Sequence, residues 1–163
     1  MICYKLKMGL IEQVRDGNLD AVKRYLEYGA NIHQQNDSAL FTAIINGHVE
    51  IVKYLLSNDF NICTQNNILL SWAVDGRSIE IVKLLLIYGL DIHTQNDSIL
   101  RKAVSNGDLE MVKFLVSNGA DIHAKNDKAL TLATEFGWQT IIDFLLSCDR
   151  ITRVKSAKNS VAK

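Results

Sequence analysis

The stretch AIINGHVEIVKYLL, residues 43–56, contains two helical patterns joined by a short turn. In its second half, apolar residues have the spacing of one helix face, at Ile51, Val52, Leu55 and Leu56. Gly47 separates the halves, because a glycine there adopts the left-handed backbone that ends a helix. The pattern returns as AVSNGDLEMVKFL at residues 103–115, so the building block is a pair of short helices.

This helix pair repeats with a period of 30 residues. The matching positions form three apolar columns, which are Leu10, Leu40, Leu70, Leu100 and Leu130; Val22, Val52, Val82, Val112 and Ile142; and Ala43, Ala73, Ala103 and Ala133. One such pair cannot bury its apolar face alone, so stacking on neighbours supplies the core. The columns divide residues 1–150 into repeats at about 7–36, 37–66, 67–96, 97–126 and 127–150.

The turn between the two helices of each repeat also has a signature. Asn18, Ser78 and Asp108 precede the second helix, where a side-chain oxygen caps the free backbone amides. In the third repeat, Gly76 comes one position early and Arg77 stands in the usual glycine place. We therefore expect that turn to differ from the others.

Composition restricts the class of protein. Of the 163 residues, 48% are hydrophobic and 22% are charged, and the formal net charge is zero. These values are typical of a folded globular chain, and they give no overall attraction to nucleic acid or membranes. Three widely spaced cysteines are no disulfide framework, and no apolar run is long enough for a signal peptide or a bilayer span. We expect an intracellular, reducing compartment and no secretion.

Residues 43–56 and 103–115, with the segment GADIHAKN at 119–126, resemble the ankyrin repeat. The resemblance covers about residues 7–150 and implies an all-α fold. That fold is an ankyrin-repeat solenoid of about five stacked helix-turn-helix repeats with short β-hairpin-like connections.

The chain departs from the common ankyrin pattern in one consistent way. The period is 30 residues and there is no proline, whereas common ankyrin repeats have a longer period and a Thr-Pro-Leu-His start. The connection is therefore expected to be short. This compact form resembles the ankyrin arrays of giant DNA viruses of the mimivirus type, which implies a viral protein in the cytoplasm or nucleus of a host cell.

Nothing in the pattern predicts catalysis, a cofactor or a metal site. His33, Cys63, His93 and His123 share one column of the connections. Stacked repeats place equivalent residues ~10 Å apart, whereas metal ligands lie ~2.0–2.3 Å from a shared ion. We therefore interpret this column as structural, and we predict that the chain is not an enzyme.

The resemblance implies binding on the concave face formed by the first helices. The residues expected there are Phe41, Thr42, Ile45, Trp72, Asp75, Arg101, Lys102 and Ser105. Trp72 is the leading candidate, because tryptophan is enriched at the centres of protein interfaces. Packing against adjacent helices is the alternative for Trp72 and is the favoured interpretation for Phe41. The partner expected is another protein, and neither a small-molecule substrate nor a membrane is expected.

Residues 151–163 are predicted to form a flexible, basic C-terminal tail. From Arg150 onward the chain carries five basic residues and no acidic ones, so residues 1–149 sum to −5. A solvated terminus is the favoured interpretation. Nucleic-acid association through this tail remains an alternative, as does a repeat remnant without a strong partner. The sequence does not predict the oligomeric state.

Overall fold

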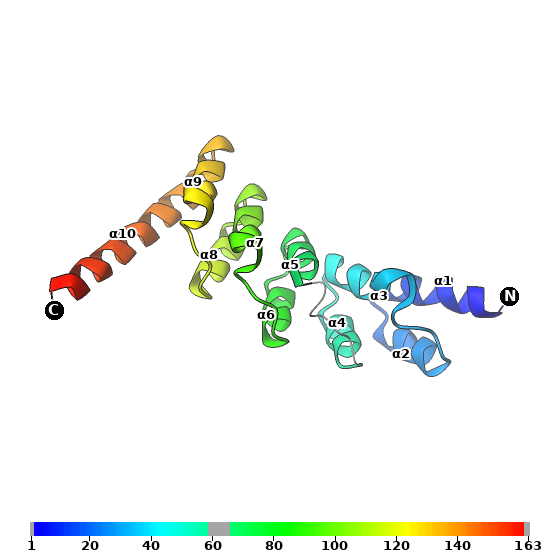
Figure 1. Ribbon diagram of the computed structural model, residues 1–163. Coiled ribbons are helices and arrows are strands. Elements are labelled where there is room, and N and C mark those ends of the chain that lie inside the picture. The colour runs from blue at the N-terminus through cyan, green and yellow to red at the C-terminus, as the bar shows by residue number, and fades with distance from the viewer. Residues whose placement is uncertain (1, 59–65, 162–163) are drawn as a thin grey trace. The chain divides into compact units, whose positions relative to one another are not determined.

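A computed structural model describes the backbone of residues 2–58 and 66–161, and the side chains of residues 9–33, 37–58 and 68–150. The helices in these ranges are α1 Ile2–Arg15, α2 Leu19–Glu27, α3 Gln34–Ile45, α4 Val49–Leu56, α5 Asn66–Asp75, α6 Ile79–Ile87, α7 Thr94–Ser105, α8 Leu109–Ser117, α9 Ala124–Glu135 and α10 Gln139–Val161. They form five consecutive pairs, so the predicted all-α fold of helix-turn-helix repeats is confirmed (Figure 1).

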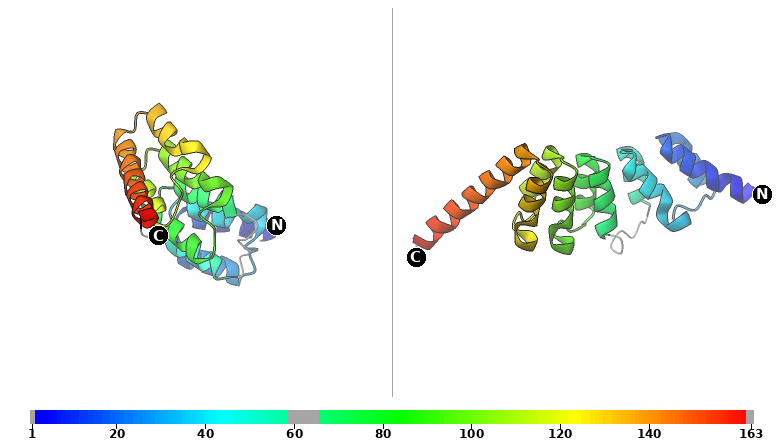
Figure 2. Two further views of the ribbon diagram at one scale, coloured as in Figure 1. Left: turned by 60° about the vertical axis from the view of Figure 1, so that its left-hand side comes forward. Right: turned by 90° about the horizontal axis from the view of Figure 1, so that it is seen from above.

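The chain divides into two compact units, Met1–Asp91 and Ile92–Lys163. In the first unit, α1, α3 and α5 pack in sequence, and α2, α4 and α6 pack beside them. In the second unit, α7 packs on α9 and α8 packs on α10. Figure 2 shows α7 and α9, green and yellow, side by side in its right-hand view. Each unit thus repeats the same two-layer arrangement.

The core consists of the columns that the sequence predicts. The leucines of the first helices are buried at Leu10, Leu40, Leu70 and Leu100, and the valines of the second helices at Val22, Val52, Val82 and Val112. The column Ala43, Ala73, Ala103 and Ala133 is fully buried. Small side chains there allow adjacent helices to approach closely. In the last repeat, Leu130 and Ile142 depart from their columns, since both are only half-buried.

The turn of the third repeat has the same geometry as the others, so the prediction that it would differ is wrong. The amide of Gly47 donates to the carbonyl of Ile44 at 3.1 Å, and the amide of Arg77 donates to the carbonyl of Val74 at 3.1 Å. Arg77 adopts a φ of +53°, in the left-handed region that Gly47 occupies at +74°. The physical reason is that the turn is set by hydrogen bonding and packing, which impose this backbone on arginine despite its Cβ.

Gly76 serves a different purpose from Gly47, the turn glycine of the preceding repeat. A Cβ at Gly76 would lie 3.2 Å from the carbonyl oxygens of Ile44 and Ile45, at the end of α3. Glycine at this position therefore allows the backbone at the end of α5 to approach the end of α3 closely.

The predicted helix caps are confirmed. Side-chain oxygens of Asn18, Ser78 and Asp108 accept hydrogen bonds from the amides of Ala21, Ile81 and Met111. Two larger rings occupy the same column in other repeats and pack against glycines instead. The His48 ring lies over Gly17, and the Trp138 ring lies over Gly107. At these two positions, a contact with the preceding repeat takes the place of a side-chain helix cap.

The connections between repeats consist of turns in the described residues 28–33, 88–93 and 118–123. They lead into α3, α7 and α9, where residues just before the regular helix adopt a left-handed backbone. At the other end, α10 continues to Val161 without a break. The predicted tail from residue 151 is thus helical in its backbone as far as Val161, and its flexibility stays a prediction.

Candidate functional site

An aromatic pair joins two repeats in the first unit. Phe41 on α3 and Trp72 on α5 meet edge to face, with ring centroids 4.2 Å apart and planes at 63°. Both side chains are half-buried. Packing and surface display are therefore combined, because each ring supports the other and still reaches solvent. Aromatic pairs in this geometry contribute about 0.5–1.5 kcal/mol beyond the burial of their area.

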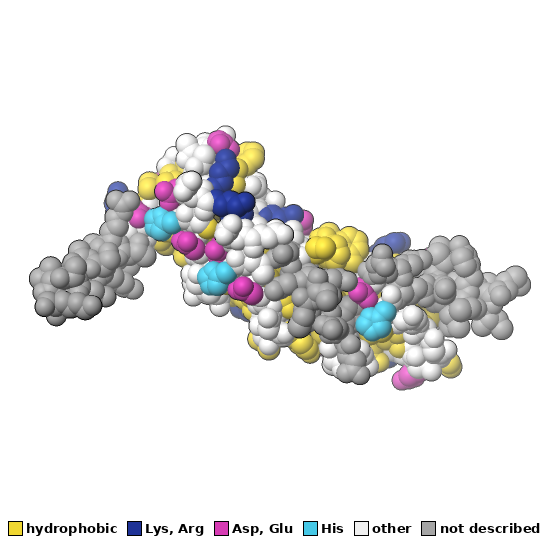
Figure 3. Space-filling model, viewed as in Figure 1, with side chains coloured by type: hydrophobic (Ala, Val, Ile, Leu, Met, Phe, Trp, Pro, Cys, Tyr) yellow, Lys and Arg dark blue, Asp and Glu magenta, His cyan; other side chains and the backbone are white. Residues whose placement is uncertain are grey.

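Two isoleucines extend the aromatic pair into a larger patch. Ile45 lies one helical turn after Phe41 and is 40% exposed, and Ile68 lies one turn before Trp72 and is 49% exposed. Residues four apart on a helix lie on one face. We call Phe41, Ile45, Ile68 and Trp72 the aromatic patch. Figure 3 shows hydrophobic side chains gathered over α3 and α5.

Ile68 was missed by the sequence analysis, although its spacing of four from Trp72 was an available signal. Asp75 is exposed one turn after Trp72, at the end of α5. It places a carboxylate beside the apolar side chains. An apolar centre next to a charged group at its rim is the usual composition of a protein interface.

Thr42 does not lie on this surface as expected. Its side chain is buried, with 9% of the residue exposed. Its carbonyl accepts a hydrogen bond of 2.8 Å from the Asn46 side chain. A side chain this short lies below its larger neighbours, so Thr42 supports the surface without forming it.

Arg101 in the second unit has a structural role that the sequence did not indicate. Its guanidinium donates hydrogen bonds to the carbonyl of Asn96 and, at 3.1 Å, to the carbonyl of Gln95. Gln95, Asn96 and Asp97 have φ values of +53° to +56°, which turns their carbonyls away from helical partners. The arginine supplies the donors that this left-handed turn lacks.

The other predicted residues of the second unit lie on the same helix. Ser105 donates its hydroxyl to the carbonyl of Arg101 at 3.0 Å. Lys102 is half-buried, like Arg101 and Ser105. These three are therefore brought together on α7, while Phe41, Thr42, Ile45, Trp72 and Asp75 belong to the first unit.

The histidine column is explained by pairing with aspartate. His33 contacts Asp37 at 3.0 Å, His93 contacts Asp97 at 3.0 Å, and His123 contacts Asp127 at 2.6 Å. Each aspartate lies four residues after its histidine and has a positive φ. Cys63 lies outside the described residues. Among the described side chains, no three His, Cys, Asp or Glu groups converge as metal ligands would.

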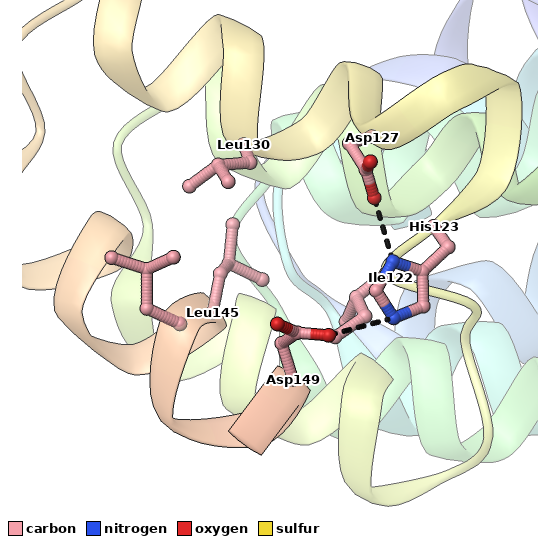
Figure 4. A pocket seen from close by; sticks show the side chains of 7 residues that line it. Ile122, His123, Asp127, Leu130, Leu145 and Asp149 are labelled. Atoms are coloured by element: carbon pink, nitrogen blue, oxygen red, sulfur yellow. Dashed lines mark hydrogen bonds and ion pairs between the residues drawn. The ribbon is translucent and has the colours of Figure 1, made fainter. Parts of the chain in front are cut away.

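A pocket of about 130 Å³ lies beside His123 in the last repeat. Its apolar wall consists of Ile122, Leu130, Leu145 and Leu146. Figure 4 shows the imidazole between two carboxylates, with Nδ1 facing Asp127 at 2.6 Å and Nε2 facing Asp149 at 3.5 Å. A neutral imidazole has one N–H and donates to one carboxylate at a time. We call this cavity the Asp127 pocket.

A second groove, between α4 and α6, is lined by the charged residues Glu50, Lys53, Glu80 and Lys83. Lys53 donates to Glu50 at 2.6 Å. This hydrogen bond, with the negative charges of Glu50 and Glu80, raises the pKa of Lys53 above its ordinary value although desolvation lowers it. An exposed pair one turn apart stabilises its own helix and is a weak binding determinant.

No helix among the described residues is both long and apolar enough to cross a membrane. A comparison of the chain with curated proteins finds no match. A protein-family model described as ankyrin repeats, in three copies, matches residues 10–96 and 94–158. This match does not bear on the resemblance to giant-virus arrays. Matched over nearly its whole length, with helix pairs that follow the same repeat, the chain belongs to the ankyrin repeat family.

Proposed function

We propose that this chain is a non-catalytic protein-binding module and that its aromatic patch is the binding surface. Ankyrin repeats are generally protein-interaction modules, which supports the class of function. Such a module acts as a scaffold, an adaptor or a competitor. The resemblance to giant-virus arrays favours a host or viral protein as its partner.

We choose this surface because of one observation. Phe41 and Trp72 meet edge to face, with ring centroids 4.2 Å apart. Each ring restricts the rotamers of the other before any partner arrives. Binding then requires little further loss of side-chain entropy. Rigid aromatic side chains are the usual anchors of protein interfaces for this reason.

The neighbouring residues complete the chemistry of the patch. Ile45 and Ile68 are exposed large hydrophobic residues in the same unit. A partner side chain that covers them gains about 25 cal/mol for each Å² of apolar surface removed from water. Asp75 beside them favours a partner with an apolar segment that ends in a basic residue.

Affinity capture with a matched pair of variants tests this proposal. Ile45→Asp places a charge in the aromatic patch without removing either ring. Ile87→Asp makes the same change on α6, at a residue that is 80% exposed in the same unit. We expect Ile45→Asp to lower the amount of captured partner at least tenfold, as for an interface residue worth ~1.4 kcal/mol or more.

The control must behave differently for the proposal to stand. Ile87→Asp should capture the same proteins as the unchanged chain, and circular dichroism should show equal helix content in both variants. Equal capture by all three chains would overturn the assignment to the aromatic patch.

A further inference from the structure

In the last repeat, an aspartate is exposed and a leucine is half-buried at positions where the preceding repeat buries both. The side chain of Asp97 is 6% exposed, whereas that of Asp127, its equivalent one period later, is 57% exposed. Leu100 is fully buried, but the equivalent Leu130 is half-buried. Leu146 on α10 is 38% exposed beside it. The Asp127 pocket thus exposes an apolar wall and a carboxylate whose equivalents in the preceding repeat, Leu100 and Asp97, are buried.

In the preceding repeat, the equivalent carboxylate of Asp97 has a second hydrogen-bond donor. Oδ1 of Asp97 accepts hydrogen bonds from the His93 ring and from the amide of Asp121. Within the described part of the chain, the carboxylate of Asp127 meets only the His123 ring. A carboxylate has about four acceptor positions, so Asp127 has capacity for a further donor.

Charge indicates which donor suits the pocket. Asp127 and Asp149 both line it, and residues 1–149 carry a net charge of −5. Residues 150–163 carry +5 with no acidic residue. In this segment Arg150 and Arg153 are three residues apart, as are Ile151 and Val154, so each pair has the spacing of one helix face. The segment therefore combines basic and apolar residues, which complement the pocket.

The pocket is lined in part by the helix that carries the basic segment. Leu145, Leu146 and Asp149 line it from α10, and residues 151–161 continue the same helix. A continuous helix advances ~1.5 Å with each residue, so its later turns move away from the face of its own earlier turns. A second copy of the chain can present the same basic and apolar residues to the whole pocket, whereas pairing within one chain would leave the protein monomeric.

We propose that the Asp127 pocket binds the basic segment of α10 from a second copy of this chain. Arg153 of the partner subunit donates to Asp127, and Val154 of the partner subunit lies against Leu130 and Leu146. The same contact in the opposite direction gives a two-fold symmetric dimer with the α10 helices antiparallel. Two-fold dimers with one self-complementary surface are the commonest protein oligomers.

Light scattering coupled to size exclusion, on the full chain at increasing concentration, tests this proposal. The unchanged chain should approach the mass of a dimer. Asp127→Arg alone and Arg153→Asp alone should each weaken dimerisation at least tenfold, because each places like charges together. An equimolar mixture of the two variants should restore the dimer, because opposite charges then meet at both contacts.

Glu135→Arg is the matched control, because it changes an exposed carboxylate on the same helix α9, outside the pocket. It should dimerise like the unchanged chain, and all variants should keep the same helix content. A chain that stays monomeric to ~1 mM, or variants that dimerise unchanged, would overturn the proposal. The proposal would also be overturned if the chain is monomeric and binds a short DNA duplex only when Arg153 is present, because the basic segment would then be a nucleic-acid-binding segment.

Discussion

The carboxylate of Asp97 accepts a hydrogen bond from the backbone amide of Asp121, with an O···N distance of 3.1 Å. These residues lie in successive connections, 24 positions apart. Asp97 also holds the His93 ring, and its side chain is 6% exposed. One buried carboxylate thus ties two connections of the second unit together.

Removing this carboxylate should destabilise the second unit. For Asp97→Ala we expect a loss of about 2–3 kcal/mol in the free energy of unfolding, because the amide of Asp121 and the His93 ring both lose a charged, buried acceptor. Urea denaturation followed by circular dichroism measures it. Asp127→Ala, measured at a concentration where the chain is monomeric, is the matched control, because Asp127 has nearly the same φ, +58° against +56°, but is exposed. A loss as large in the control would show that the backbone, and not the hydrogen bond, causes the effect.

Arg77 should be less favourable than glycine in its turn. Its φ of +53° strains a residue that has a Cβ. We expect Arg77→Gly to be about 1 kcal/mol more stable than Arg77→Ala, since both remove the side-chain contacts and only alanine keeps the Cβ. Thermal or urea unfolding of the two variants gives the difference. Equal stability would contradict the strained backbone.

Gly107 should tolerate alanine less well than Gly137. Both have a positive φ, +66° and +72°, so both substitutions strain the backbone by a similar amount. A Cβ at Gly107 would also lie 2.8 Å from the Trp138 ring, whereas nothing lies within 4 Å at Gly137. We expect Gly107→Ala to be destabilised by a further ~1–2 kcal/mol, with altered tryptophan fluorescence. Equal losses and unchanged fluorescence would disprove the contact.

Arg101 should affect stability more than partner binding. Its guanidinium spans the carbonyls of Asn96 and Gln95. Arg101→Ala should lower the free energy of unfolding by about 1–2 kcal/mol. Arg101→Lys should not restore it, because an ammonium group lacks the planar fork that reaches both carbonyls. Urea denaturation of both variants measures this. Full stability in either variant would return Arg101 to the list of binding candidates.

The sequence predicted those features that repeat with apolar periodicity or capping chemistry. Leu40 and Val52 are buried as their columns require, and Asp108 caps its helix as its oxygen allows. These properties depend on residue type and local spacing, which the chain displays directly.

Other features depend on the three-dimensional path of the backbone, which spacing does not reveal. Arg77 adopts a glycine conformation that its residue type disfavours. Arg101 donates hydrogen bonds to a left-handed segment that no sequence motif predicts. Thr42 is buried although Phe41, beside it in sequence, reaches the surface. The pairing of Phe41 with Trp72 also needed the distance between two helices. The structure therefore places the candidates on the expected helices, whereas their side-chain directions were not predictable from spacing; their role in binding stays a prediction.

The most direct test of the central claim is photocrosslinking from the aromatic patch in living cells. A benzophenone amino acid replaces Ile68, and in a separate control it replaces Ile87, which is exposed in the same unit. The account predicts that light produces a discrete crosslinked partner from position 68, that position 87 produces none, and that Ile45→Asp abolishes the product. The same product from both positions, or from position 87 alone, would contradict binding at this patch.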